Sequence, residues 1–291
     1  MFETIEELVA LAHVHGSLAE AMIQTEMEQS QRSREVIIEH MEKNLEVMQT
    51  SIKKGVAGVT SVTGLTGGDA PRINAYINQG NFLSGETILR AVQNAMAVNE
   101  VNAEMGLICA TPTAGSAGVA AGVLSALADE RQLTKEQQIN FLFAAGAIGL
   151  VIANNASISG AAGGCQAEVG SASAMASGAL VEVCGGTPEQ SAHAVAITIV
   201  NMLGLICDPV AGLVEIPCIK RNALGASQAF ISADMALAGV KSVIPVDEVI
   251  DAMHQVGMQM PSAFTETAEG GLAATKTGKK IMHQLFNNTP K

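Results

Sequence analysis

This chain has no tryptophan and a single tyrosine, so aromatic residues make up only 3% of its 291 residues. Large rings therefore cannot fill its core. The chain is nevertheless 48% hydrophobic and carries 29 glycines and 14 methionines. A core of small and pliable side chains requires closely packed helices, so we expect a mostly α fold.

Positive charge is also scarce, because 28 acidic residues stand against 16 basic ones and leave a formal net charge of −12. Basic clusters such as Lys53-Lys54 and Lys279-Lys280 are too short to form a nucleic-acid-binding face. We therefore expect no nucleic-acid partner.

The most apolar run, residues 141–153, ends at Asn154 and is shorter than the roughly 20 residues that cross a bilayer. We interpret it as a buried helix and expect no membrane partner. The first residues include Glu3, Glu6 and Glu7 in place of a positively charged leader, which predicts a cytoplasmic protein. In the cytoplasm the five cysteines should be reduced and form no disulfide framework, so each is a core residue, a metal ligand or a reactive thiol.

Helical periodicity recurs along the whole chain, with no fixed repeat and no Pro/Ser-rich linker, and we expect one compact domain over residues 1–291. Two capping boxes, Thr134-x-x-Gln137 and Thr187-Pro188-x-Gln190, mark helix starts, and Ser84 is a further candidate cap. The other expected helices cover residues 5–12, 36–48, 166–183, 220–238 and 247–259.

Glycine-rich loops over residues 55–70, 109–118, 157–165 and 204–218 each precede an expected helix. A helix N-terminus presents unpaired N–H groups and a partial positive charge. We therefore expect these loops to form anion-binding sites.

Three cysteines, Cys165, Cys207 and Cys218, lie at expected helix starts or beside cations, surroundings that favour the thiolate. Each could instead be a small core side chain, as we expect for Cys109 and Cys184. The chain has no Cys-x-x-Cys pair of the kind that structural zinc sites and ferredoxins use. Three widely spaced thiolates suit a four-iron cluster with one iron open to a substrate oxygen.

Four stretches of the sequence together resemble the α chain of the iron-sulfur-dependent L-serine dehydratases, or L-serine ammonia-lyases. They are GLTGGDA (64–70), MGLICATPTAGSAGV (105–119), NASISGAAGGCQAEVGSASAMAS (155–177) and GLICDPVAGLVEIPCIKRN (204–222). The resemblance implies a helical chain in which Cys165, Cys207 and Cys218 hold a 4Fe-4S cluster. It also implies conversion of L-serine to pyruvate and ammonia, a step of amino-acid degradation that feeds gluconeogenesis.

This chemistry suggests roles for further residues. The open iron would withdraw charge from the serine hydroxyl while a base, which we do not identify, takes the Cα proton. The candidate residues for binding the substrate or holding the cluster near it are Thr66, Gly67, Gly68, Ser116, Lys220 and Arg221. Asn155 and Asn222 either help to bind the substrate or form hydrogen bonds with buried backbone groups.

Single-chain members of the family carry a Ser-His-Thr-type motif that this sequence lacks. We therefore expect a separate β chain as partner and little activity without it. The alternative is a non-catalytic iron-sulfur or metal-binding subunit with a regulatory or scaffold role. A pyridoxal phosphate enzyme is disfavoured, because the sequence shows no alternation of strands with helices. Within the same family, threonine or cysteine could replace serine as the substrate.

Overall fold

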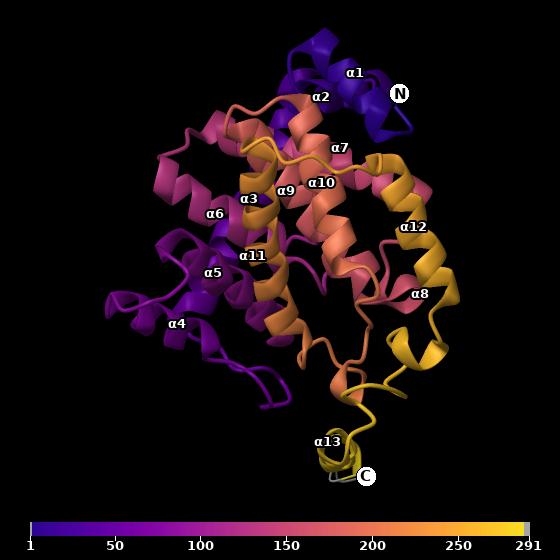
Figure 1. Ribbon diagram of the computed structural model, residues 1–291. Coiled ribbons are helices and arrows are strands. Elements are labelled where there is room, and N and C mark those ends of the chain that lie inside the picture. The colour runs from indigo at the N-terminus through magenta and orange to yellow at the C-terminus, as the bar shows by residue number, and fades with distance from the viewer. Residues whose placement is uncertain (1, 288–291) are drawn as a thin grey trace.

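The computed structural model describes residues 2–287, and helices account for nearly all of its regular structure (Figure 1). The α-helices are α1 (Ile5–His15), α2 (Leu18–Ser30), α3 (Arg34–Ala57), α4 (Asp69–Asn78), α5 (Glu86–Ala103), α6 (Gly118–Arg131), α7 (Lys135–Asn155), α8 (Gly160–Cys165), α9 (Ser171–Val183), α10 (Pro188–Met202), α11 (Cys218–Leu237), α12 (Val246–Gln259) and α13 (Lys276–Asn287). A π-helical turn covers Gln166–Gly170, and 3-10 turns cover Val210–Gly212 and Ser262–Phe264. The expected mostly α fold is confirmed.

Polar caps begin several helices where the sequence predicts them. Thr134 and Thr187 each accept a hydrogen bond from the backbone of the glutamine three residues later, whose side chain bonds back to the threonine N–H. Both capping boxes are thus confirmed. Ser84, however, does not cap α5, which follows Gly85. The chain turns at Gly85 with a φ of 82°, a conformation that favours glycine, and this places Ser84 one residue too early.

Carboxylates from distant parts of the chain occupy three helix N-termini. Their oxygens accept hydrogen bonds of 2.5 to 3.4 Å from the first backbone N–H groups of the helix: Asp247 at α1, Glu182 at α2 and Glu100 at α4. Burial raises the pKa of Glu100 and of Glu182. The anion site expected before α4 is therefore filled by the protein's own Glu100.

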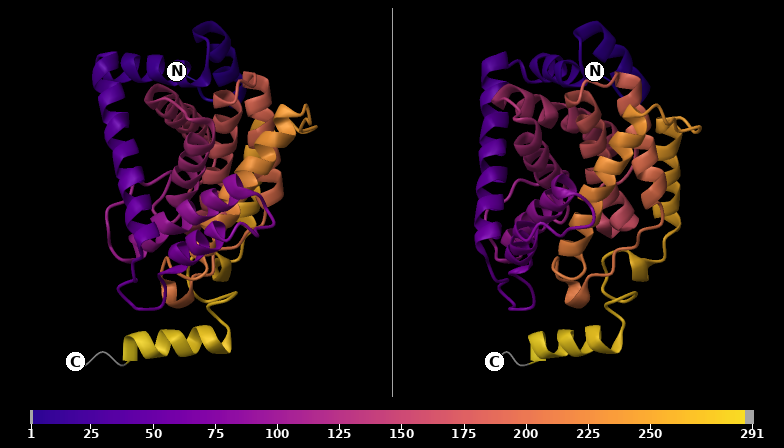
Figure 2. Two further views of the ribbon diagram at one scale, coloured as in Figure 1. Left: turned by 90° about the vertical axis from the view of Figure 1, so that its left-hand side faces the viewer. Right: turned by 60° about the vertical axis from the view of Figure 1, so that its left-hand side comes forward.

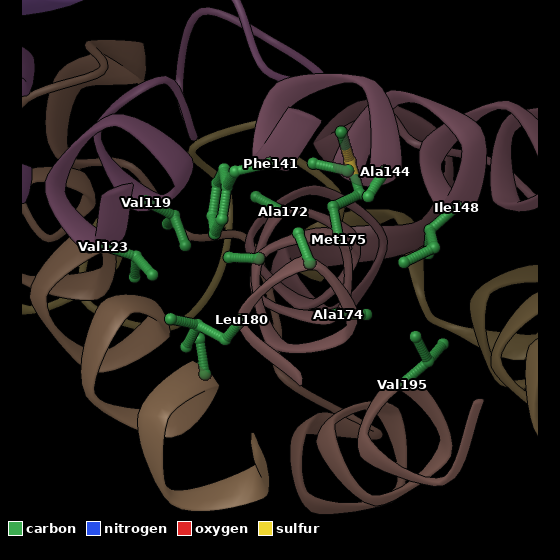
Figure 3. Close-up of a cluster of buried hydrophobic side chains, with 14 of the residues drawn as sticks. Val119, Val123, Phe141, Ala144, Ile148, Ala172, Ala174, Met175, Leu180 and Val195 are labelled. Atoms are coloured by element: carbon green, nitrogen blue, oxygen red, sulfur yellow. The ribbon is translucent and has the colours of Figure 1, made fainter. Parts of the chain in front are cut away.

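Helix α9 runs through the centre of the core, and its residues 171–181 are all buried. Figure 3 shows Val119 of α6, Phe141 of α7 and Val195 of α10 pointing toward it around Met175 and Leu180. Its many serine, alanine and glycine residues let the surrounding helices approach closely, as the composition predicts.

Helix α7 is long and apolar enough to cross a membrane by length and composition. It is longer than the apolar run 141–153 because it begins at Lys135. Most of its apolar side chains are buried, with Phe141 and Ile152 fully so, and the helix packs against α2 and α9. It is a core helix, as interpreted from the sequence.

The N-terminal helices lie at one end of the molecule, and α13 stands apart from the helical body at the opposite end (Figure 2). Helix α11 starts near that second end, and α12 runs back toward it (Figure 1). The segment between Cys207 and α11 contacts α13 through the turn Val210–Gly212. This end of the bundle carries the cysteine-bearing segments.

Candidate metal centre

Cys165 lies at a break inside a helical segment. Helix α8 begins at Gly160, so helical structure starts before the expected residue 166, and it is interrupted at Gly164, whose φ is 73°. A side chain at Gly164 would also collide with Met260, with its Cβ 2.6 Å from the sulfur. The chain continues from Cys165 as a π-helical turn, and π-helical turns often occur at functional sites.

Cys207 is held by extended backbone pairing with a segment near the C-terminus. Its N–H donates to the carbonyl oxygen of Phe264 at 2.8 Å, and its carbonyl oxygen accepts from the N–H of Glu266 at 3.1 Å. By sequence, Asp208-Pro209, which follows Cys207, is a plausible cap and first turn of a helix. Only the short turn Val210–Gly212 forms there, because the Asp208 carboxylate is buried and bonds instead to the N–H of Leu272 at 2.7 Å.

Cys218 is the first residue of α11 and is buried, as are Cys165 and Cys207. The sulfur atoms of Cys165 and Cys207 and a carboxylate oxygen of Glu168 lie within 4.8 Å of one another. Cys218 is not part of this close group, but it lies near enough to interact electrostatically with both thiols: the charge of Cys165 helps raise the pKa of Cys218, and the charge of Cys218 helps raise that of Cys207. The fold thus brings two thiols that are 42 residues apart in the sequence, Cys165 and Cys207, into one group and places Cys218 within electrostatic range of both.

The three thiols have different ionisation properties. A hydrogen bond with Cys207, together with the positive charge of Arg221, holds the pKa of Cys165 below its ordinary value. The same hydrogen bond and burial raise the pKa of Cys207, and burial raises that of Cys218. Cys165 is therefore the thiol most ready to be a thiolate before a metal binds.

The two adjacent basic residues after Cys218 have different surroundings. Arg221 is largely buried and contacts the Cys165 sulfur at 3.4 Å, the carbonyl oxygen of Ile206 at 2.9 Å and the Asp208 carboxylate at 2.7 Å. Lys220 is exposed and pairs with Asp69 at 3.1 Å. Arg221 thus connects two cysteine-bearing segments, whereas Lys220 reaches over the surface to the start of α4.

The glycine-rich loops are fastened by buried carboxylates. The hydroxyls of Thr63 and Thr66 donate to the two oxygens of Glu215 at 2.7 and 2.6 Å, and the buried Glu215 lies three residues before Cys218. Gly67 forms an isolated antiparallel β-bridge with Thr60. Gly68 is the residue before α4, and its backbone interacts with the Glu100 carboxylate. The hydroxyl of Thr66 is therefore engaged within the protein.

The loop 109–118 is fastened in the same way. The Thr113 hydroxyl donates to Glu168, and Ser116, which is fully buried, lies 3.0 Å from the Thr113 hydroxyl. Asn222 spans this loop and α11, donating to the carbonyl oxygens of Gly115 and Cys218 and accepting from the N–H of Gly118. The fold places Ser116 and Thr66 on loops that contact residues adjacent to the cysteines.

Several residues near this centre were not singled out from the sequence, namely Glu100, Glu168, Glu215 and Glu266. Glu168 and Glu215 do lie inside the two cysteine-bearing stretches that resemble the family, and a buried acidic residue amid glycines and alanines is a usable signal. Glu266 is 59 residues from Cys207 and gives no such signal.

The remaining two cysteines are not fully buried. Cys109 is half-buried and packs against the core, as expected. Cys184 is exposed rather than buried, because it follows the last turn of α9, where the chain leaves the core.

The sequence is similar to known proteins along almost its whole length. Residues 14–273 match the family described as serine dehydratase alpha chain. The chain is 60% identical over 287 residues to the "Probable L-serine dehydratase, alpha chain" of Bacillus subtilis (strain 168), covering 98% of this chain and 96% of that one. It is 44% identical over 289 residues to the "L-serine dehydratase, alpha chain" of Peptoniphilus asaccharolyticus, covering 98% and 99%. The "L-serine dehydratase" of Streptomyces coelicolor is 41% identical in an alignment of 285 positions that covers 94% of this chain and 60% of that longer one.

Proposed function

Because the chain belongs to the serine dehydratase alpha chain family, we propose that it is the α subunit of a cytoplasmic L-serine ammonia-lyase that makes pyruvate and ammonia. Cys165, Cys207 and Cys218 would hold a 4Fe-4S cluster, and a β chain would complete the active site. The proximity of the buried Cys165 and Cys207 sulfurs, with the buried Cys218 near enough to interact with both electrostatically, carries this proposal. The expected single catalytic domain over residues 1–291 stays part of the proposal, and a continuous hydrophobic core with members from Phe2 to Met253 is consistent with it.

The residues present fit an iron-sulfur group. Thiolates are the usual ligands of such clusters, and three of them leave one iron without a protein ligand. Gly160 adds space at the centre, because a Cβ there would lie only 3.1 Å from the Cys207 sulfur. Arg221 supplies positive charge where the thiolates and the cluster would together be negative.

When bound, the cluster would supply Lewis acidity that polarises the β-hydroxyl of serine as a leaving group. Loss of this hydroxyl as water and of the Cα proton to a base yields aminoacrylate, which becomes pyruvate and ammonia by tautomerisation and hydrolysis. We assign the base to the β chain. This chain would fix the geometry, since Glu215 and Glu168 hold the two glycine-rich loops against the cysteine-bearing segments.

We further propose that Thr66, Gly67, Gly68 and Ser116 form the wall that faces the substrate carboxylate, with Lys220 and Arg221 as the nearby cations. Arg221 is fully occupied by its three contacts, so its role would be to hold Cys165 and the segment of Cys207 together. Lys220 is exposed and held by one surface ion pair, which leaves it able to approach an anion.

The test is anaerobic co-expression with the β chain, followed by measurement of iron, sulfide and pyruvate formation from L-serine. Cys165→Ala, Cys207→Ala and Cys218→Ala should each remove most of the iron and all activity, whereas Cys184→Ala should change neither. Circular dichroism checks that the helices persist. A complex that holds the cluster but leaves serine unchanged would support the non-catalytic alternative, and turnover of threonine or cysteine instead would change the substrate.

A further inference from the structure

A cavity of about 890 Å³ lies among α3, α4, α5, α6 and the start of α7, and its volume is typical of small-molecule sites. Its lining includes positions 49, 52, 53, 56 and 57 on α3, positions 90, 93 and 94 on α5, and positions 125, 128 and 129 on α6. Residues three and four apart share one face of a helix, so each of these helices turns a continuous face toward the cavity. Among the lining residues that the structure describes, none is a cysteine.

Two carboxamide side chains of this lining are buried without a hydrogen-bond partner. Gln93 is 4% exposed and Asn94 is 6% exposed, and both belong to α5. The Oε1 atom of Gln93 has no partner, and no hydrogen bond joins either amide to another group within residues 2–287. Buried polar groups are nearly always hydrogen-bonded, because burial removes their bonds to water. The wall of the cavity thus carries hydrogen-bonding groups that the protein leaves unused, which indicates a polar ligand.

Positive charge in the lining is also available to a ligand. Lys53 is exposed and forms no ion pair within the described residues. Arg90 pairs at 2.7 Å with Glu86, which is half-exposed and does not line the cavity. An ion pair at the surface is weak, so Arg90 can exchange it for an anion in the cavity. Asp129 is the single carboxylate among the described lining residues, so cations predominate there.

Aliphatic side chains form another part of the wall. Ile52 and Val56 of α3 and Leu133, which lies between α6 and α7, also line the cavity. Covering such surface with an apolar ligand face is favourable. A ligand that fits must therefore combine an apolar face with hydrogen-bonding edges and a negative charge. Free phosphate and sugar phosphates lack the apolar face.

We propose that this cavity binds a purine nucleoside monophosphate. A purine has apolar faces and an edge of donors and acceptors, which suits Gln93 and Asn94 because each amide offers both kinds of group. A phosphate monoester carries a charge of about −1.5 to −2 at neutral pH, which Lys53 and Arg90 balance. Asp129 is an acceptor for the ribose hydroxyls. The proposal is independent of the proposed function, because no cysteine of the metal centre lines this cavity.

The experiment is isothermal titration calorimetry of the full-length chain, purified anaerobically, with AMP and with GMP. At least one of the two nucleotides should bind once per chain with a Kd below about 1 mM. Adenosine, ribose 5-phosphate and inorganic phosphate are titrated for comparison. Each should bind at least about 10-fold more weakly than the nucleotide, because each lacks the base or the phosphate.

Two adjacent lysines provide a variant and its matched control. Lys53→Met should weaken nucleotide binding by roughly 10- to 150-fold, as expected for loss of a hydrogen bond to a charged group. Lys54 pairs with Glu104 at 2.6 Å and is not among the lining residues. Lys54→Met removes the same charge from the chain and should change binding less than about 2-fold, because solvent screens a charge outside the cavity.

The buried amides give a second readout that a structural role would not share. Asn94→Leu replaces an unpartnered amide with an apolar side chain of similar size. It should weaken nucleotide binding by roughly 2- to 10-fold, and it should leave the Tm of the free chain unchanged or raise it. Gln93→Met makes the same change one residue away and decides the matter if Asn94→Leu fails to fold.

Several results would overturn the proposal. One is the absence of saturable binding of both AMP and GMP below about 1 mM. Another is inorganic phosphate that binds as tightly as the nucleotide, which would show attraction of an anion only. Binding that Lys53→Met and both amide variants leave unchanged would place the nucleotide elsewhere. A lowered Tm for both amide variants would show that these side chains serve the fold and not a ligand.

Discussion

Asn222 offers a direct test of how the loop 109–118 is joined to α11. Its side chain is fully buried and makes hydrogen bonds of 2.7 Å to the Gly115 carbonyl oxygen, 3.0 Å to the Cys218 carbonyl oxygen and 3.1 Å from the Gly118 N–H. Asn222→Ala removes all three. Each is worth about 0.5 to 1.5 kcal/mol.

The loss is partly offset because Asn99 also bonds to the Gly115 carbonyl oxygen and the Gly118 N–H, at 2.9 and 3.0 Å. Those two backbone groups would therefore not be left unpaired. Adding the small cavity that alanine leaves, we expect a loss of about 3 kcal/mol in the free energy of unfolding. Urea unfolding of the isolated chain, followed by circular dichroism, measures it.

Asn155→Ala is the matched control. Asn155 also donates to two carbonyl oxygens, those of Glu3 and Val151, but it is exposed at the end of α7. Water can replace its bonds, so the loss should stay below about 1 kcal/mol. A loss below about 1 kcal/mol for Asn222→Ala as well would show that Asn99 alone secures the loop, and our reasoning about Asn222 would be wrong.

Two other predictions concern helix packing and acid stability. Gly122→Ala should destabilise the chain by about 1 to 3 kcal/mol, because the new Cβ would lie 2.6 Å from the backbone nitrogen of Ala95. Gly146→Ala should stabilise it by about 0.5 to 1 kcal/mol, because the new Cβ would meet nothing within 4 Å. Urea unfolding that ranks the two variants the other way would contradict this packing. The hydrogen bond to Arg34 holds the pKa of Glu20 below its ordinary value, so the ion pair stabilises the fold above the unfolded-state pKa and ceases to do so as the pH falls through the lower folded-state pKa. The stability difference between wild type and Arg34→Met should therefore shrink from pH 7 to pH 3, and a constant difference would contradict the assignment.

Local signals predicted much of the fold correctly. The capping boxes at Thr134 and Thr187 succeed because each motif satisfies its own backbone groups within one turn. Ser84 failed as a cap because the left-handed turn at Gly85 decides where α5 begins, and a serine next to a glycine does not reveal which residue turns. The break at Gly164 was hidden for a similar reason, since Gly163 and Gly164 are adjacent and the sequence does not reveal which of them turns.

The candidate site was predictable only in part. The three cysteines could be named because their sequence surroundings resemble those of a known family. The fastening of the loops by Glu215 and Glu168 and the filling of the α4 N-terminus by Glu100 could not, because each contact joins segments far apart in the chain. A free helix N-terminus and one already occupied by a carboxylate look identical in a sequence.

The amino-acid sequence by itself determined the helical class and the positions of most helices, since these follow from periodicity and caps, and its resemblance to a known family named three thiols as candidate ligands. The tertiary structure alone decided that Arg221 is buried against Cys165 while Lys220 is at the surface, and that Glu266 faces Glu168 across Gly160. Charge pairing, burial and the space beside a glycine depend on which distant segments meet, and only the folded chain brings those segments together.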